Sequence, residues 1–227
     1  MLIPGQEILP AAIMAGAVLL VGGAVVWQYF AEKKRREDLA AAALRLGLEY
    51  RADDPGLARE TFSGFPLFCQ GRNRQFSNVL RGRLDADAEV LVFDHSYVTG
   101  SGKNRHTCRQ SAAAFRAPRL ALPAFELRPE NILHKVGGLF GYQDIDFDAS
   151  PGFSSKYLLR GKDEPAVRGL FDAAVLNHFE LHPGWRVEGQ GEWLVVCREG
   201  RRVAAEDLRT FLDEAKTTFC AFRNRGR

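Results

Sequence analysis

One run of residues contains types that often cooperate in catalysis, Asp94-His95-Ser96-Tyr97. It offers a hydroxyl nucleophile, a base and a carboxylate that could orient the base. If the run lies on a strand, successive side chains point to opposite faces, so Asp94 and Ser96 share one face while His95 and Tyr97 share the other. An Asp–His–Ser relay therefore cannot form locally. We interpret these residues as structural polar groups near the end of a sheet.

A second candidate is the pair His106 and Cys108. Two residues apart on a strand they share a face, and a Cys–His pair can act as nucleophile and base or as two metal ligands. The sequence shows no third ligand, so we predict no metal site. The neighbouring Lys103 and Arg105 indicate that His106 and Cys108 lie on an exposed hairpin without a catalytic role. The alternative is an enzyme of unknown type with a site near His106/Cys108.

Acidic residues alternate with apolar ones in Asp144, Asp146 and Asp148. A calcium-binding EF-hand would require Gly at the sixth loop position and Glu at the twelfth, where this chain has Ala149 and Ser155. The pattern therefore favours a half-buried extended segment with an acidic outer face. A weak metal or ligand site, or the site of an enzyme, at Asp144–Asp148 is the alternative.

Basic residues cluster in two predicted turns, at Arg72 and Arg74 and at Lys103 and Arg105. If the two turns lie together, they could face the phosphates of lipid or nucleic acid. Aromatic residues are sparse between these charges, unlike in single-strand binders. We therefore interpret these four residues as ordinary solvated charge. The alternative is that they bind a partner, and for that alternative we expect lipid in preference to nucleic acid.

Other features limit the classes of function. The net charge of +3 is well below that of a dedicated nucleic-acid binder. The sequence contains no Gly-rich phosphate loop, HExxH, GxSxG or nucleotide-binding fingerprint. We therefore predict no cofactor and no recognisable catalytic motif.

The segment Ile8–Ala31 contains 24 residues without Asp, Glu, Lys or Arg. As a helix it would be roughly 36 Å long, enough to cross a hydrocarbon core of about 30 Å. A cleaved signal peptide would have a basic start, a shorter apolar run and small residues at its end. None of these is present, so residues 1–31 are predicted to be a retained transmembrane anchor.

Charge predicts how this anchor is oriented. Four basic residues, Lys33 to Arg36 (Lys33, Lys34, Arg35 and Arg36), follow the apolar run, and none precedes it. The positive-inside rule then places the N-terminus outside and the rest of the chain in the cytoplasm, at the inner (plasma) membrane. Trp27 and Tyr29 are expected at the headgroup level together with the four basic residues.

This topology affects two further predictions. Cytoplasmic thiols stay reduced, so Cys69, Cys108, Cys197 and Cys220 are expected to be free and mostly buried. Small residues recur at four-residue spacing in the anchor, as in Ala12 and Gly16, which would allow close contact between helices of a homodimer.

After the anchor the sequence predicts a helix over Glu32–Leu46 that ends at Gly47, and then a polar linker over Glu49–Glu60. Strands are predicted over five segments joined by short turns, which favours an antiparallel meander. In Glu89–Thr99 apolar residues occupy both faces, as in a central strand. The five predicted strands are Phe62–Cys69, Gln75–Leu84, Glu89–Thr99, His106–Arg116 and Leu120–Leu127.

Helices and a few strands are predicted in the remainder. A short helix begins at Pro129, Asp144–Asp148 is extended, and Lys156–Arg160 is a strand. A longer helix capped by Asp163 reaches His178, a hairpin joins Trp185–Glu188 to Trp193–Arg198, and an apolar stripe marks a C-terminal helix over Ala204–Phe222. The expected fold is α+β, with an anchor at 1–31, a juxtamembrane helix and linker at 32–60 and a soluble domain at 61–227.

Four segments resemble a family of uncharacterised bacterial single-pass membrane proteins: Val90–Ser111, Leu122–Asn131, Asp144–Phe171 and the LxxFLDEA pattern of the last helix. The resemblance implies a single soluble domain behind an N-terminal anchor and implies no activity. We therefore expect a protein- or lipid-binding module at the inner membrane surface, with membrane lipid around residues 8–31 and a protein partner at the membrane.

Overall fold

The computed structural model describes residues 8–54, 56–57, 61–130 and 144–224. Its fold is α+β and its last element is a helix, as the sequence predicted. The helices and strands are α1 (Ile8–Arg45), β1 (Glu49–Asp53), α3 (Pro66–Cys69), β2 (Arg72–Arg83), β3 (Glu89–Thr99), η1 (Gly102–Asn104), β4 (His106–Arg116), β5 (Leu122–Pro129), α4 (Pro151–Ser154), β6 (Tyr157–Gly161), α5 (Glu164–Leu170), α6 (Ala173–Leu181), β7 (Arg186–Gly191), β8 (Trp193–Cys197) and α7 (Leu208–Arg223).

Eight strands form one antiparallel sheet in the order β1-β2-β3-β4-β8-β7-β5-β6. The predicted meander is confirmed for β2, β3 and β4, which pair in chain order. It stops at β4, because the C-terminal hairpin of β7 and β8 lies between β4 and β5. The sequence could not indicate this insertion, since a long connection separates the hairpin from its neighbours.

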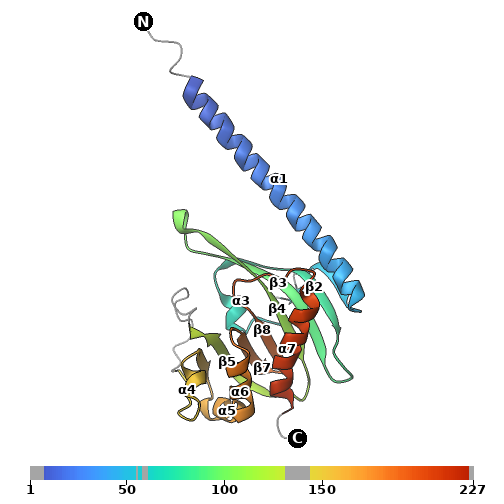
Figure 1. Cartoon of the computed structure of the whole chain (residues 1–227), viewed down its shortest axis with the longest axis vertical. Coiled ribbons are helices and arrows are strands. Elements are labelled where there is room, and N and C mark those ends of the chain that lie inside the picture. The colour runs from blue at the N-terminus through green and yellow to red at the C-terminus, as the bar shows by residue number, and fades with distance from the viewer. Residues whose placement is uncertain (1–7, 55, 58–60, 131–143, 225–227) are drawn as a thin grey trace.

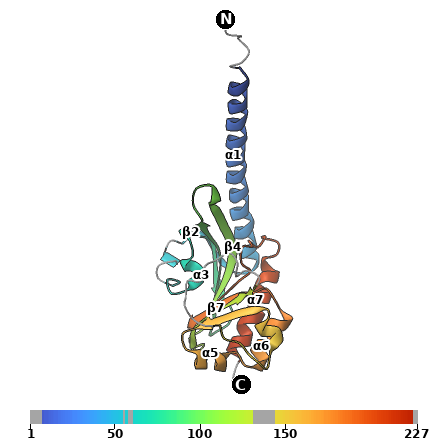
Figure 2. The same cartoon turned by 90° about the vertical axis from the view of Figure 1, so that its left-hand side faces the viewer.

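Helix α1 extends away from the rest of the molecule (Figures 1 and 2). Only its C-terminal part packs on the sheet, through the buried side chains of Leu39, Ala42 and Ala43. The helix ends before Gly47, whose φ of 70° is in the left-handed region that favours glycine at a helix end. The predicted continuation of the helix beyond Ala31 and its stop at Gly47 are confirmed.

The projecting part of α1 exposes large apolar side chains. The exposed fraction is 75% for Leu19, 77% for Leu20 and 74% for Trp27. In the part of the chain that the structure describes, no helix combines the length and apolarity required to cross a membrane. The predicted transmembrane span is therefore still a prediction.

The sheet is covered on both faces. The larger core lies between the sheet and helices α5, α6 and α7, and includes Val90 and Val92 of β3. The smaller core lies on the opposite face beneath α3, and includes Leu91 and Phe93. The prediction that β3 is a central strand with two apolar faces is confirmed.

Two predictions for the region before β2 are wrong. Phe62–Cys69 is not a strand: it contains turns and the short helix α3, because Pro66 occupies the first helical turn, where its missing N–H costs little. The predicted linker contains the strand β1, which pairs with β2 from Glu49↔Arg81 to Asp53↔Ser77. Its alternation is half-exposed and polar, as on an edge strand, so the sequence pattern is weak.

Other differences fall later in the chain. The predicted helix from Asp163 to His178 is two helices, α5 and α6, with a separate N-cap at Asp172, which accepts from the N–H groups of Ala174 and Val175. The segment Asp144–Asp148, predicted to be extended, forms no strand: residues 144–147 belong to neither helix nor strand, and Asp148 lies in a turn. Pro129 ends β5, and the rest of the helix predicted to start there lies outside the described residues. The β7–β8 hairpin and the C-terminal helix are confirmed within a few residues.

Candidate binding groove at the base of helix α1

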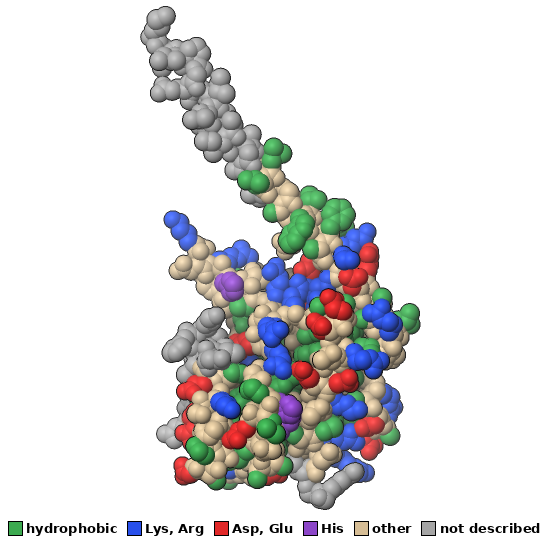
Figure 3. All heavy atoms as spheres, in the orientation of Figure 1, with side chains coloured by type: hydrophobic (Ala, Val, Ile, Leu, Met, Phe, Trp, Pro, Cys, Tyr) green, Lys and Arg blue, Asp and Glu red, His purple; other side chains and the backbone are tan. Residues whose placement is uncertain are grey.

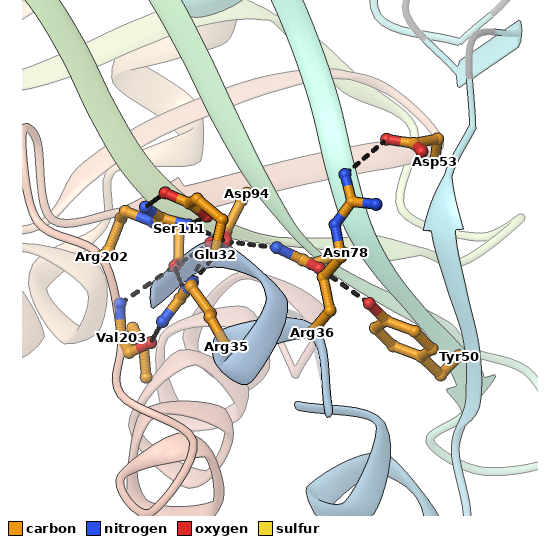
Figure 4. Close-up of polar contacts among 10 residues, drawn as sticks. All are labelled: Glu32, Arg35, Arg36, Tyr50, Asp53, Asn78, Asp94, Ser111, Arg202 and Val203. Carbon is orange, nitrogen blue, oxygen red and sulfur yellow. Dashed lines mark hydrogen bonds and ion pairs between the residues drawn. The ribbon is translucent and has the colours of Figure 1, made fainter. Parts of the chain in front are cut away.

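Asp94, in the middle of β3, joins the base of α1 to the sheet (Figure 4). Its side chain is 8% exposed, and its two oxygens accept hydrogen bonds from Arg35 Nε and Nη2, both at 2.8 Å. Asn78 Nδ2 donates to Asp94 at 2.9 Å and Ser111 Oγ at 2.6 Å. The carboxylate therefore connects α1 with strands β2, β3 and β4.

The loop before α7 completes this contact (Figure 4). Arg202 binds both oxygens of Glu32, at 2.6 and 2.7 Å, and approaches Asp94 at 3.3 Å. Arg35 Nη1 donates to the Val203 carbonyl at 2.8 Å. Glu32 and Arg35 of α1 are thus fixed by residues more than 160 positions later in the chain, which the sequence alone could not reveal.

The ion pairs perturb the protonation of these groups. The hydrogen bond from Arg202 lowers the pKa of Glu32 more than burial raises it. Burial alone would raise the pKa of Asp94, but the hydrogen bond and charge of Arg35, with Ser111 and Arg202, outweigh it and lower the pKa. Both carboxylates are therefore ionised at neutral pH, and α1 is attached by fully charged pairs.

An irregularity in β2 helps to form this site. The pairing of β2 with β3 shifts between Arg72 and Gln75 and again between Ser77 and Leu80, and Asn73 and Asn78 both have φ of 52°. Asparagine tolerates this left-handed conformation better than most residues. Asn78 is buried, accepts from the Tyr50 hydroxyl at 2.8 Å and donates to Asp94. An Asn inside an otherwise regular strand is the signal that could have suggested this bulge.

A groove of about 770 Å³ opens beside these ion pairs, and we refer to it as the α1 groove. One wall is the face of α1 that carries Gln28, Glu32 and Arg36. The other wall comes from the sheet: the first half of β2, the end of β3 and the start of β4. Because β1 pairs with β2 only as far as Ser77, the edge of β2 before that residue has no strand beside it in the described chain.

The groove carries basic side chains from several elements. Arg36, Arg74, Arg105, Arg109 and Arg202 line it. Lys and Arg side chains gather where α1 meets the domain and along the neighbouring hairpin (Figure 3). Arg105 and Arg109 form no ion pair with any described residue, whereas Arg202 is paired with Glu32. The α1 groove therefore offers cationic groups to an anionic ligand.

The predicted binding residues are partly brought together. Arg74 and Arg105 both line the α1 groove, although they come from different turns. Arg74 also donates to the Phe68 carbonyl at 3.2 Å. Arg72, at the start of β2, and Lys103, in the hairpin tip, are exposed and lie outside the groove lining. Sequence reasoning missed Arg109, because a single Arg among the polar residues at the start of a strand gives no separate signal.

The predicted interface residues of α1 separate into two groups. Trp27, Tyr29, Lys33, Lys34 and Arg36 are exposed, as an interfacial role requires. Arg35 differs, since its side chain is only 16% exposed and is engaged by Asp94. The structure therefore assigns Arg35 to docking of the helix, which corrects its predicted place among the headgroup contacts.

The Asp94–Tyr97 run has the alternation that the sequence predicted. Asp94 points toward α1, whereas His95 packs on the other face between Phe76, with ring centroids 4.9 Å apart, and Tyr97, at 5.3 Å. Burial lowers the pKa of His95 to about 3, so the ring is neutral. Asp94 and His95 are therefore structural, and no relay joins the residues of this run.

The remaining candidate sites stay separate. His106 is exposed, Cys108 is half-buried, and the structure shows no hydrogen bond between these two described residues. The side chains of Asp144, Asp146 and Asp148 are at the surface while Ile145 is buried. Among the described residues no cluster of three His, Cys, Asp or Glu side chains is placed to hold a metal. The enzyme alternative stays an untested prediction.

All four cysteines are free thiols. Cys197 is buried, and burial raises the pKa of its thiol. Cys69, Cys108 and Cys220 are only partly buried, so the prediction of free thiols is confirmed and that of mostly buried ones holds for Cys197 alone.

A buried ion network that the sequence did not suggest lies elsewhere in the sheet. The Arg186 side chain is fully buried and contacts Glu188 at 2.6 Å, Glu126 at 2.7 Å and Glu199 at 3.3 Å. Burial raises the pKa of Glu188 to about 7 against the opposing charge of Arg186. Glu188 Oε2 also accepts from the N–H of Leu67 at 2.9 Å. This network joins the strands to the segment containing α3, so we interpret it as structural.

Comparison with known proteins identifies a related fold. No family model and no curated protein sequence matches the chain, so the predicted family remains a prediction. A solved structure, that of the mycobacterial trehalose monomycolate transport factor A, TtfA, has a TM-score of 0.57 with this chain at 13% sequence identity. The alignment covers 85% of this chain and 93% of that one. At this identity the similarity shows the fold alone.

Proposed function

We propose that this chain is a membrane-anchored binding module at the inner membrane surface. One observation carries the proposal: α1 is a single helix whose exposed, apolar part projects from the domain while its base is fixed to the sheet by charged pairs. Exposing Leu19, Leu20 and Trp27 to water is unfavourable by roughly 25 cal/mol per Å² of apolar surface. Insertion of residues 8–31 in a bilayer removes that surface from water.

Charge gives the proposed orientation. Lys33, Lys34 and Arg36 are exposed immediately after the apolar part, which supports placing them at the cytoplasmic headgroups with the N-terminus outside. Trp27 and Tyr29 then lie at the interface, where aromatic residues are enriched. Because Arg35 is fixed to the sheet and Glu32 to the loop before α7, the domain would be held against the membrane in a defined orientation and not on a flexible tether.

The α1 groove is the binding part of the module in this proposal. It opens beside the exit of the anchor, and its size is in the range of small-molecule sites. A headgroup or a segment of a membrane protein would reach it from the bilayer. The solved protein with the related fold is a transport factor, and a binding role that acts beside a membrane is compatible with that name.

The experiment that tests this proposal is fractionation of cells expressing the full chain, followed by an alkaline carbonate wash of the membranes. We expect the wild-type chain to stay in the washed membranes. The variant Leu20→Asp/Val25→Asp places two carboxylates in the apolar segment, each of which costs about 3 kcal/mol in membrane insertion. We expect it to move to the soluble fraction.

A matched control makes the same chemical change on the domain. Leu44 and Leu181 are 81% and 66% exposed, so Leu44→Asp/Leu181→Asp adds two carboxylates to existing surface. We expect this variant to fractionate like the wild type. Release of the wild-type chain by carbonate, or retention of both double variants, would refute the proposal.

A further inference from the structure

The strands of the α1 groove present a row of hydrogen-bond donors on one face. Asp94 points toward α1, and on a strand every second residue shares its face, so Ser96 does as well. Paired residues of antiparallel strands point to the same side, and β4 places Arg109 opposite Ser96 and Thr107 opposite Val98. Arg105 continues the row, about 13 Å along the strand from Arg109.

This row has a surplus of positive charge. Residues 95–125 contain no Asp or Glu. Most carboxylates that line the groove already face an arginine: Glu32 pairs with Arg202, Asp94 with Arg35, and Asp53 lies 3.9 Å from Arg36. Arg109 attracts Glu32 electrostatically but forms no ion pair, and Arg105 also forms none with a described residue. The unsatisfied charge of the groove is therefore cationic.

The direction of the β3–β4 hairpin relative to α1 bears on where the α1 groove would lie at a membrane. Its tip projects from the domain on the same side as the exposed part of α1, and both views show this (Figures 1 and 2). The tip carries Lys103, and Arg105 follows it. If the apolar part of α1 enters a bilayer, the tip and the groove behind it approach the headgroups of the leaflet that α1 leaves.

We propose that the α1 groove binds the phosphate of an anionic phospholipid headgroup, with Arg105 and Arg109 as its charged ligands and the hydroxyls of Thr107 and Ser96 as further donors. Arginine suits this ligand because its guanidinium can donate two parallel hydrogen bonds to a phosphate. The inference rests on the proposed function, since it takes the groove to lie beside the membrane. It adds the chemical class of the ligand and the residues that select it.

The test uses the full chain purified in a nonionic detergent and isothermal titration calorimetry. The probes are dihexanoylphosphatidylglycerol, dihexanoylphosphatidylcholine and glycerol 3-phosphate. We expect the anionic lipid to bind more tightly than the zwitterionic lipid, because only the former keeps a net negative charge beside the two arginines. We also expect it to bind more tightly than glycerol 3-phosphate, which lacks the acyl chains that the adjoining detergent and α1 accommodate.

Variants identify the residues. Arg105→Gln/Arg109→Gln removes two charges from the groove, and we expect it to weaken binding of the anionic lipid by roughly 30-fold. Arg81→Gln/Arg119→Gln removes two exposed charges elsewhere and is the matched control, with unchanged affinity expected. Thermal unfolding of both variants verifies that they keep the fold.

Four results would overturn the inference. Equal affinity for the two lipids would remove the role of charge, and an unchanged affinity of Arg105→Gln/Arg109→Gln would remove the site. Glycerol 3-phosphate binding as tightly as the lipid would assign the groove to a soluble phosphate ester. Binding of none of the probes would leave the groove to another class of ligand, such as an extended polypeptide along the free edge of β2. Because the titration is done in detergent, it fails or succeeds independently of the carbonate wash.

Discussion

Replacing Asp94 by Asn tests how α1 is attached to the domain. The substitution keeps the shape of the side chain but removes the charge that accepts two 2.8 Å hydrogen bonds from Arg35. It also places an amide, which carries two N–H donors, among the donors of Arg35, Asn78, Ser111 and Arg202. The largest effect is on Arg35, whose charge is then held at 16% exposure without a carboxylate.

The expected magnitude follows from this burial. Removing one partner of a buried ion pair typically costs about 3–5 kcal/mol. Arg35 keeps its hydrogen bond to the Val203 carbonyl and some access to solvent, so we expect the lower end, about 3 kcal/mol. Because Arg35 and Asp94 act on each other, Arg35→Gln/Asp94→Asn should lose at least about 1 kcal/mol less than the sum of the two single variants.

The assay is urea unfolding of the full chain in detergent, monitored by tryptophan fluorescence, in which Trp185 and Trp193 report on the domain. Asp53→Asn is the matched control, because Asp53 is 61% exposed on its side chain and 3.9 Å from Arg36. We expect the control to change the free energy of unfolding by less than about 0.5 kcal/mol. An Asp94→Asn chain as stable as this control would refute the docking of α1 through Asp94. So would a double variant Arg35→Gln/Asp94→Asn whose loss in the free energy of unfolding equals the sum of the losses of the two single variants.

Three further predictions concern other parts of the domain. The pKa of His95 is about 3 in the folded chain, below its unfolded value of 6.5. The stability that depends on neutral His95 is therefore fully present above pH 6.5 and is lost as the pH falls toward 3. Between pH 7 and 5 the free energy of unfolding of His95→Gln should decrease by about 2 kcal/mol less than that of the wild type. Arg186→Met should cost about 3–5 kcal/mol in urea unfolding, because it leaves the buried Glu188 without a cation and leaves Glu126 and Glu199 with Arg128 alone. Phe62→Ala should cost about 3–5 kcal/mol in the same assay, because Phe62 is fully buried among Phe65, Phe68, Phe76, Phe93 and Trp193.

Each of these predictions has a result that contradicts it. Parallel pH profiles for His95→Gln and the wild type would mean that the pKa of His95 is the same in the folded and the unfolded chain. A neutral or stabilising Arg186→Met would mean that the carboxylates around it accept protons at little cost. A Phe62→Ala chain that loses less than about 1 kcal/mol would mean that the smaller core beneath α3 contributes little to the fold.

The sequence predicted the elements whose patterns are local. Strands β3 and β4 were predicted with their observed bounds, since their runs of apolar residues and the glycine-rich turn between them are local features of the sequence. Local chemistry also marks three helix ends: the stop of α1 at Gly47 and the N-caps at Asp163 and Asp172. The sequence predicted the first two and missed the cap at Asp172. The strand predicted over Phe62–Cys69 is wrong, because the apolar residues of this segment lie in turns and in the short helix α3, which pack on one face of the sheet.

The candidate site depended on contacts that no local pattern reports. Arg35 looked like one of four equivalent basic residues after an apolar run, yet it alone is buried against Asp94, 59 residues away. Arg202 reaches Glu32 across 170 residues. Only the order of the strands brings Arg74 and Arg105 to one groove. Composition could suggest that basic turns meet, but the partner of each charge required the fold.

The central claim is that residues 8–31 anchor the domain in the membrane with the sheet on the cytoplasmic side. Fusing alkaline phosphatase or green fluorescent protein after residue 227 of the full chain, in bacteria, tests it most directly. The account predicts a fluorescent fusion and an inactive phosphatase, both in the membrane fraction. An active phosphatase with a dark fluorescent fusion would place the sheet outside and contradict the account.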